Sequence, residues 1–267
     1  SSFGCNLDAK DCADEEYSET PLRATGNDCF GSPGRNDWYD TVKLNYGIDY
    51  RTGNRCFSPV PNTWVKMLKI LRYWAAMGID GFRCDMVEMT PVEFWNWAVA
   101  KIKEEFPGII FIGEIYQPHI YRSFIKEGHF DYLYDKVGLY DTLRAVMNGQ
   151  TSASDISYAL QSTSDIRGNM LTFLENHDEQ RIASDFFAAK AERALAALIV
   201  SATTGTEPFM LYAGQEFGER GMDKEGYSGV DGRTTIFDYW SVDTKLLPQR
   251  AEALCTGRYF LHGKFLL

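Results

Sequence analysis

The sequence lacks the short motifs that usually bind nucleotides and metals. No Gly-rich dinucleotide fingerprint and no phosphate-binding P-loop follows any predicted strand, so nucleotide cofactors are not expected. The 4 histidines and 6 cysteines form no CxxC pair and no spacing typical of a metal site. We therefore predict no bound metal and no certain cofactor.

Positive charge is also scarce. The chain has 27 Lys and Arg against 37 Asp and Glu, which gives a net charge of -10 and a pI near 5.0. A surface of this sign repels a phosphate backbone, so nucleic acid is not an expected partner. The charge instead favours a neutral or cationic ligand.

Long hydrophobic runs are missing too. The longest apolar stretch, at residues 194–205, is too short to span a bilayer, and residues 1–20 are acidic and polar, unlike a signal peptide. We expect no membrane partner and no evident targeting signal. Four cysteines lie within the first 56 residues, where one or two disulfides would fit. An extracytoplasmic location, secreted or periplasmic, is favoured, although the localisation stays open.

What is present is the composition of a globular protein. With 267 residues, 45% hydrophobic and 14% aromatic, the chain can build one large core or two small ones. Residues 1–60 are rich in Gly, Asp, Asn, Thr and Ser and read as a long irregular segment. From residue 61 onward, apolar residues follow helical and strand periods in turn.

The alternation repeats as strand followed by helix. Helices are expected at 62–78, 91–106, 118–128 and 188–204, with helical or mixed material at 138–164. Strands are expected at 79–85, 109–114, 130–135, 170–178 and 208–216. Five such units in series predict an α/β fold with a parallel sheet and crossover helices.

Acidic residues stand near the carboxyl end of four predicted strands. They are Asp85, Glu114, Asp178 and Glu216. In α/β barrels this edge of the sheet carries catalysis, whereas the amino edge contributes to stability. Any one of these residues alone is more often a helix N-cap or a solvated loop residue, but four in register favour a site.

The stretch Gly78 to Asp85 places two charges inside an apolar run. Successive strand residues face opposite sides, so Phe82 and Cys84 share one face while Arg83 and Asp85 lie side by side on the other. A structural ion pair at a strand end would explain the pair on its own. The alternative is that the second face belongs to a site.

Three short motifs follow one another along the chain: DGFRCD at 80–85, FIGE at 111–114 and ENHD at 175–178. They resemble the motifs of the α-amylase superfamily, glycoside hydrolase family thirteen. VKLN at 42–45 is similar to the form found in the neopullulanase and cyclomaltodextrinase branch. The resemblance implies a (β/α)8 TIM barrel. It implies Asp85 as nucleophile, Glu114 as general acid/base and Asp178 as the third carboxylate, which holds sugar hydroxyls. Arg83 and His177 would line the same sugar site.

The chemistry of a retaining glycosidase suits these residue types. It needs two carboxylates about 5 to 5.5 Å apart, one ionised to attack and one protonated to release the leaving group. Arg83 is expected to keep Asp85 ionised by charge and hydrogen bonding. The apolar neighbours Ile112 and Ile115, with the other carboxylates, are expected to raise the pKa of Glu114. His177 would donate to a ring hydroxyl, unless it is a packed structural histidine.

Part of the family pattern is missing. The family's strand-three motif, which binds sugar and often calcium, has no counterpart, so a structural calcium would depend on sequence absent here. We predict that residues 61–267 form barrel strands four to eight and that residues 1–60 are a remnant of the loop domain after strand three. The missing barrel half would come from the same longer chain, which is favoured, or from a partner chain. Residues 1–267 alone are then expected to be poorly soluble, oligomeric or inactive.

The resemblance implies a retaining glycoside hydrolase acting on α-1,4 and, alternatively, α-1,6 bonds of starch-like glucans through a glucosyl-Asp85 intermediate. A glucan transferase or isomerase of the same family, or an inactive truncated carbohydrate-binding relative, is the alternative. Aromatic residues such as Trp38, Tyr39 and Tyr116 suit stacking on sugar rings, but none is singled out. Linkage and chain-length specificity, calcium dependence, disulfide pairing and oligomeric state stay open.

Overall fold

The computed structural model describes residues 44–49, 52–222, 231–233 and the backbone of 265–266. The chain forms two compact units, residues 1–77 and 78–267. Most of the segment predicted to be irregular, residues 1–43, lies outside the described residues, as do Cys5, Cys12, Cys29 and Cys255. Cys56 and Cys84 are free thiols.

The first unit contains one long helix and a small hairpin. Helix α2 (Asn62–Ala76) buries one face, formed by Trp64, Leu68, Leu71 and Ala75. Strands β1 (Ile48–Asp49) and β2 (Asn54–Arg55) pair in the antiparallel direction. The indole of Trp64 donates a hydrogen bond to the carbonyl of Tyr46 at 3.0 Å, which ties the helix to the segment before β1.

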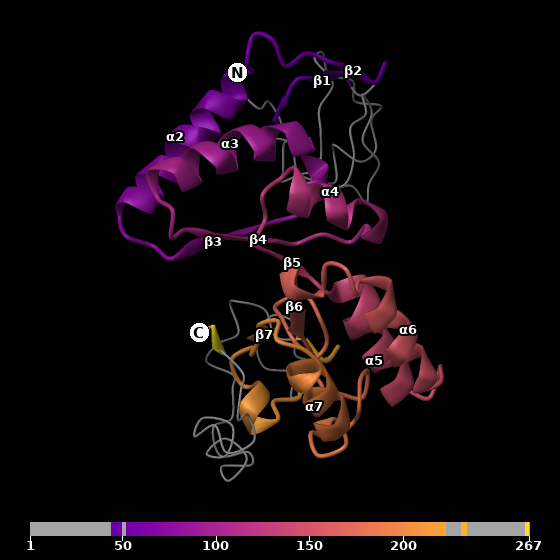
Figure 1. The fold of residues 1–267 in the computed structure, drawn as a ribbon. Helices are drawn as coiled ribbons and strands as arrows, with labels where there is room; N and C mark the ends of the chain where they lie inside the picture. Colours follow the sequence, from indigo (N-terminus) through magenta and orange to yellow (C-terminus); the bar gives the residue numbers. More distant parts are fainter. Residues whose placement is uncertain (1–43, 50–51, 223–230, 234–264, 267) are drawn as a thin grey trace, which may run out of the picture. The chain divides into compact units, whose positions relative to one another are not determined.

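The second unit is built on one parallel sheet (Figure 1). Its strands follow the chain order β3-β4-β5-β6-β7-β8, and each pairs with the next in the parallel direction. The strands are β3 (Gly81–Cys84), β4 (Ile110–Gly113), β5 (Tyr132–Tyr134), β6 (Met170–Phe173), β7 (Phe209–Met210) and β8 (Phe265–Leu266). A run of neighbouring parallel strands joined by helices is the arrangement of part of a (β/α)8 barrel, as the sequence predicted.

Helices connect these strands. They are α3 (Val92–Glu105), α4 (Tyr121–Lys126), α5 (Asp141–Met147), α6 (Ser154–Ser162) and α7 (Leu195–Thr203). Helix α5 contacts both α6 and α7 (Figure 1). A core of buried residues from β5, β6, β7, α5, α7 and the segments between them includes Tyr134, Tyr140 and Phe173. The rings of Tyr140 and Phe173 stack with centroids 5.1 Å apart. The core therefore reaches the carboxyl ends of β5 and β6.

Two sequence predictions need correction. The sheet has a sixth strand, β8, in the C-terminal segment where no strand was expected. The helix expected at 188–204 begins only at Leu195. Ala189 has a left-handed φ of 63°, and its N–H bonds to the carbonyl of Ser184 at 2.8 Å, so a turn replaces the first part of that helix. Alanine favours helix locally, but tertiary packing overrides that preference here.

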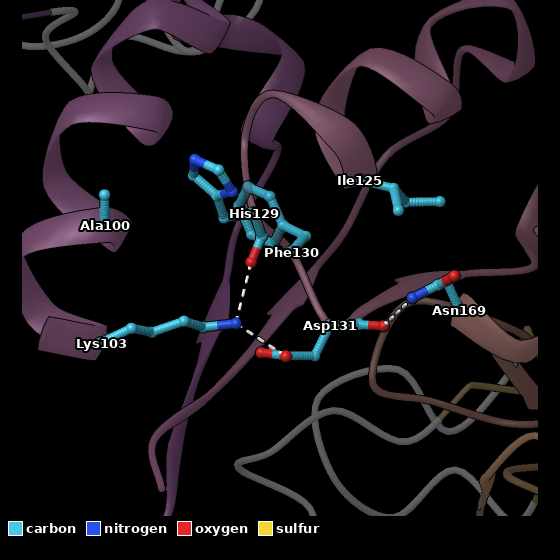
Figure 2. Close-up of a pocket in the computed structure, with 7 residues that line it drawn as sticks. All are labelled: Ala100, Lys103, Ile125, His129, Phe130, Asp131 and Asn169. Atoms are coloured by element: carbon cyan, nitrogen blue, oxygen red, sulfur yellow. Dashed lines mark hydrogen bonds and ion pairs between the residues drawn. The ribbon is translucent and has the colours of Figure 1, made fainter. Parts of the chain in front are cut away.

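A cavity of about 370 Å³ opens at the amino ends of the strands (Figure 2). Asp131 and Asn169, which line it, directly precede β5 and β6. Lys103 reaches across the cavity to the Asp131 carboxylate at 2.7 Å and to the carbonyl of His129 at 3.0 Å (Figure 2). The second oxygen of Asp131 accepts the N–H of Phe111 at 2.7 Å. These contacts connect α3, β4 and β5 at the amino-terminal edge of the sheet, which in α/β barrels contributes to stability.

No helix within the described residues is long and apolar enough to cross a membrane.

Candidate active site

The register between β3 and β4 places the predicted charged residues next to each other at the carboxyl ends of the two strands. Arg83 is paired with Ile112, and Cys84 with Gly113. The N–H of Glu114 continues the ladder by donating to the carbonyl of Cys84 at 2.9 Å. Asp85 and Glu114 therefore leave the carboxyl ends of neighbouring strands side by side.

Arg83 binds both of these carboxylates. Its Nη1 pairs with Asp85 Oδ1, and its Nη2 lies 2.9 Å from Glu114 Oε1. The sequence placed Arg83 and Asp85 on one face, and the structure confirms that they contact each other. The guanidinium also contacts Glu114, which follows the adjacent strand β4. A structural ion pair confined to β3 would not make this contact.

The two carboxylates differ sharply in exposure. The side chain of Asp85 is 62% exposed, whereas that of Glu114 is 2% exposed. Burial raises the pKa of Glu114, and the nearby Asp85 carboxyl adds to the rise. The Tyr116 hydroxyl, the Arg83 guanidinium and the N–H of Met86 oppose it. The predicted rise in the pKa of Glu114 is thus confirmed in direction, with burial as its main cause.

Glu114 is held by three donors. The Tyr116 hydroxyl donates to Oε1 at 2.7 Å, and the backbone N–H of Met86 donates to Oε2 at 3.1 Å. Arg83 is the third. These contacts leave the carboxyl group one orientation at the strand end.

The Met86 contact depends on an unusual backbone. Met86 adopts the left-handed conformation, with φ 40° and ψ 55°, directly before a 3₁₀ turn at Val87–Met89. A non-glycine residue in this region costs roughly 1 to 2 kcal/mol, so the surrounding contacts must impose it. The carbonyl of Val87 accepts hydrogen bonds from the Trp95 indole at 3.2 Å and from the Thr90 hydroxyl at 3.1 Å, and these contacts anchor the turn.

The third predicted carboxylate lies on the loop after β6. Asp178 is 54% exposed, and His177 Nε2 lies 3.2 Å from its Oδ2. The Asn176 side chain accepts the N–H of Asp178 at 2.8 Å and so fixes the turn. The negative charge of Asp178 contributes to a raised pKa of Tyr116, after burial and the larger effect of Glu114.

A buried ion pair closes this loop. Arg181 Nη1 lies 2.7 Å from Glu175 Oε2, and the side chains are 2% and 0% exposed. The other oxygen of Glu175 accepts the N–H of Ile182 at 2.7 Å, and Arg181 Nη2 donates to the carbonyl of Ala213 at 2.8 Å. The pair brackets the segment that carries His177 and Asp178.

Sequence reasoning missed several residues beside the site. Tyr134 ends β5, and its ring lies 5.6 Å from the Arg83 guanidinium. Lys136 lies 3.3 Å from Glu179 and 5.9 Å from the centre of the Tyr116 ring. Tyr116 was only one of several aromatic candidates. Its spacing of two from Glu114 was a usable signal, because i and i+2 share a face in extended chain.

Glu216 follows a different pattern from the other acidic residues. Its carboxylate accepts the N–H of Gly214 at 3.0 Å, within its own turn after β7. Among the described residues, no three His, Cys, Asp or Glu side chains gather as a metal site. Direct contacts join Arg83 to Asp85 and Glu114, and Asp178 contacts His177 and Asn176 on its own loop.

Comparison with known proteins agrees with this geometry. Residues 60–248 match the family model of the alpha amylase catalytic domain. The alpha-amylase MalA of Haloarcula japonica is 33% identical over 159 residues, which cover 58% of this chain and 22% of MalA. An alpha-1,4-glucan:maltose-1-phosphate maltosyltransferase of Rhodospirillum rubrum is 33% identical over 66 residues, or 24% of this chain and 10% of that protein.

Solved structures show the same fold. The cyclic alpha-maltosyl-(1→6)-maltose hydrolase of Arthrobacter globiformis, in complex with that sugar, superimposes with a TM-score of 0.61 at 19% identity. The match covers 95% of this chain and 55% of the hydrolase. The chain thus spans about half of this structure and less than a quarter of MalA. On the family match and the barrel fold, the chain belongs to the alpha-amylase catalytic-domain family.

Proposed function

We propose that this chain supplies the catalytic carboxylates of a retaining glycosidase acting on α-glucosidic bonds of starch-like glucans. The observation that carries the proposal is the pairing of an exposed Asp85 with a buried Glu114 across one guanidinium. Two carboxyl groups whose surroundings separate their protonation states are what acid/base and nucleophilic roles require. The α-1,4 bond is the proposed target, with α-1,6 as a further one.

Each group has a defined task. The carboxylate of Asp85 attacks the anomeric carbon while Glu114 gives its proton to the leaving glycosidic oxygen, which yields a glucosyl-Asp85 ester. Glu114, now ionised, takes a proton from water as the water attacks the ester, and free Asp85 is restored. Arg83 stabilises negative charge on both groups during this exchange. Asp178 and His177 are proposed to hold sugar hydroxyls.

Transfer is the alternative outcome of the same steps. If a sugar hydroxyl replaces water in the second step, the enzyme becomes a glucan transferase without any change in the carboxylates. The partial match to a maltosyltransferase supports keeping this alternative. The ratio of hydrolysis to transfer products from maltotetraose would separate the two.

The proposal includes further barrel strands, since a (β/α)8 barrel closes with eight. We propose that the remaining strands complete the sugar site, supplied by the same longer chain or by a partner chain. Activity is therefore to be measured in a form of the protein with a closed barrel.

The test of the proposal is the variant Glu114→Gln, which cannot donate a proton. For maltooligosaccharides, kcat/KM is expected to fall by about 10²- to 10⁴-fold. For α-maltosyl fluoride, whose leaving group departs without a proton, the glycosylation step is expected to change little. Added azide, which needs no general base, is expected to speed the second step and give a glycosyl azide.

Glu104→Gln is the matched control, because Glu104 is an exposed residue of α3. It is expected to behave like the parent on both substrates. Equal losses for Glu114→Gln on the fluoride and on maltooligosaccharides in the glycosylation step would remove Glu114 from the acid/base role.

A further inference from the structure

The loops after β3 and β4 are tied to each other in both directions. The N–H of Met86, in the first loop, donates to Glu114 Oε2 at 3.1 Å. In return, the N–H of Tyr116, in the second loop, donates to Glu88 Oε1 at 3.1 Å. A further bond from the N–H of Val87 to the carbonyl of Glu114, at 2.9 Å, closes the connection.

Tyr116 is consequently held at both ends by carboxylates. Its backbone N–H is bound by Glu88, and its hydroxyl donates to Glu114 Oε1 at 2.7 Å. The ammonium of Lys136 lies over one face of its ring, 5.9 Å from the centre. The position of the phenol oxygen at Glu114 therefore depends on where Glu88 places the backbone of Tyr116.

A carboxylate is an unexpected partner for the Tyr116 N–H if the contact serves stability alone. Its second oxygen, Oε2, is buried and has no hydrogen-bond partner in the described part of the chain. A buried, unsatisfied carboxylate oxygen is costly and calls for an explanation beyond stability. Control of the neighbouring acid/base group provides one.

We propose that Glu88 is a positioning residue for Glu114, acting through the backbone and hydroxyl of Tyr116. The inference rests on the proposed function, in which Glu114 is the general acid/base. Glu88 itself contacts neither Asp85 nor the reacting sugar in this scheme. Its effect is to keep one donor of Glu114 in place.

The expected consequence is a change in the protonation of Glu114. The hydroxyl of Tyr116 stabilises the ionised form and so lowers the pKa of Glu114 against the larger effect of burial. Loss of this donor must raise that pKa. A general acid works while protonated, so the alkaline limb of the kcat/KM profile would move to higher pH.

Other charged and titratable groups also lie around the Glu114 carboxyl and Tyr116, and the variants must leave these residues unchanged. They are Arg83, Asp85, Tyr134, Lys136, Asp178 and Glu179.

The experiment compares four single variants, one double variant and one control variant in the closed-barrel protein. Tyr116→Phe removes the donor itself, Glu88→Ala and the bulkier Glu88→Leu remove the acceptor for the Tyr116 N–H, and Glu88→Gln keeps an acceptor oxygen. The side-chain carboxyl carbon of Glu114 is followed by ¹³C NMR during a pH titration, which does not depend on turnover. The pH profile of kcat/KM on maltotriose is the second readout.

Tyr116→Phe is expected to raise the pKa of Glu114 and the alkaline limb by about one pH unit, the size expected for one hydrogen bond to a charged group. Glu88→Ala and Glu88→Leu are expected to move both in the same direction, whereas Glu88→Gln is expected to match the parent. In the double variant Glu88→Ala with Tyr116→Phe, the shift should not exceed that of Tyr116→Phe alone. Glu104→Ala, an exposed change on α3, is the control and should move neither readout.

An unmoved Glu114 titration in Glu88→Ala and Glu88→Leu would overturn the proposal. So would shifts that add up fully in the double variant, because they would show that Glu88 does not act through Tyr116. A parent protein with no activity on α-glucans would overturn the proposed function instead, while a shifted Glu114 titration in the Glu88 variants would still support the positioning role.

Discussion

Asp85→Asn is expected to lower kcat on maltooligosaccharides by about four orders of magnitude or more. Asparagine keeps the size of the side chain but cannot form the glucosyl ester, so the two-step route is lost. Activated substrates such as α-maltosyl fluoride should not rescue it, in contrast to Glu114→Gln, because the missing group is the nucleophile. Steady-state kinetics on both substrates measure the difference.

Asp155→Asn is the matched control, since Asp155 is exposed on α6 and outside the site. It should retain the parent kcat. Recovery of Asp85→Asn on the fluoride would show instead that Asp85 is not the nucleophile.

Glu175→Ala is expected to destabilise the protein by about 3 to 5 kcal/mol, because it leaves a buried guanidinium without its carboxylate. The side chains of Glu175 and Arg181 are 0% and 2% exposed, and Glu175 also accepts the N–H of Ile182. Urea denaturation provides the free energy of unfolding. The loop that carries Asp178 should lose its fixed form as the pair is broken.

A second ion pair in the same region is the control. Arg220 and Asp185 lie 2.9 Å apart, but their side chains are 51% and 60% exposed. Asp185→Ala should cost less than about 1 kcal/mol, because an exposed pair gains little over hydration. Equal losses for the two variants would show that burial does not determine the strength of the Glu175–Arg181 pair.

The parts of the site that follow from strand geometry were predictable from the sequence. Arg83 and Asp85 share a face because side chains alternate along a strand, and Asp85 and Glu114 meet because neighbouring parallel strands end at one edge. The raised pKa of Glu114 follows from its apolar neighbours. Roles for Asp85, Glu114, Asp178, Arg83 and His177 came from a family resemblance and stay predictions until variants are measured.

Contacts between loops were beyond prediction. The hydrogen bond from the Tyr116 N–H to Glu88 involves a 3₁₀ turn that follows the left-handed Met86. No local pattern in the sequence predicts that turn or the conformation of Met86. The late start of α7 has a similar origin, because hydrogen bonds within the preceding turns outweigh the helical preference of alanine. Tertiary contacts, rather than residue preferences, decide these features.

The most direct test of the central claim, a double displacement between Asp85 and Glu114, is the anomer first released from a maltooligosaccharide. Proton NMR during the first minutes of hydrolysis distinguishes the two anomers before they interconvert. The account predicts that the α-anomer appears first, because two inversions at the anomeric carbon restore its configuration. Initial release of the β-anomer would contradict it, since a single displacement by water would then bypass the ester on Asp85.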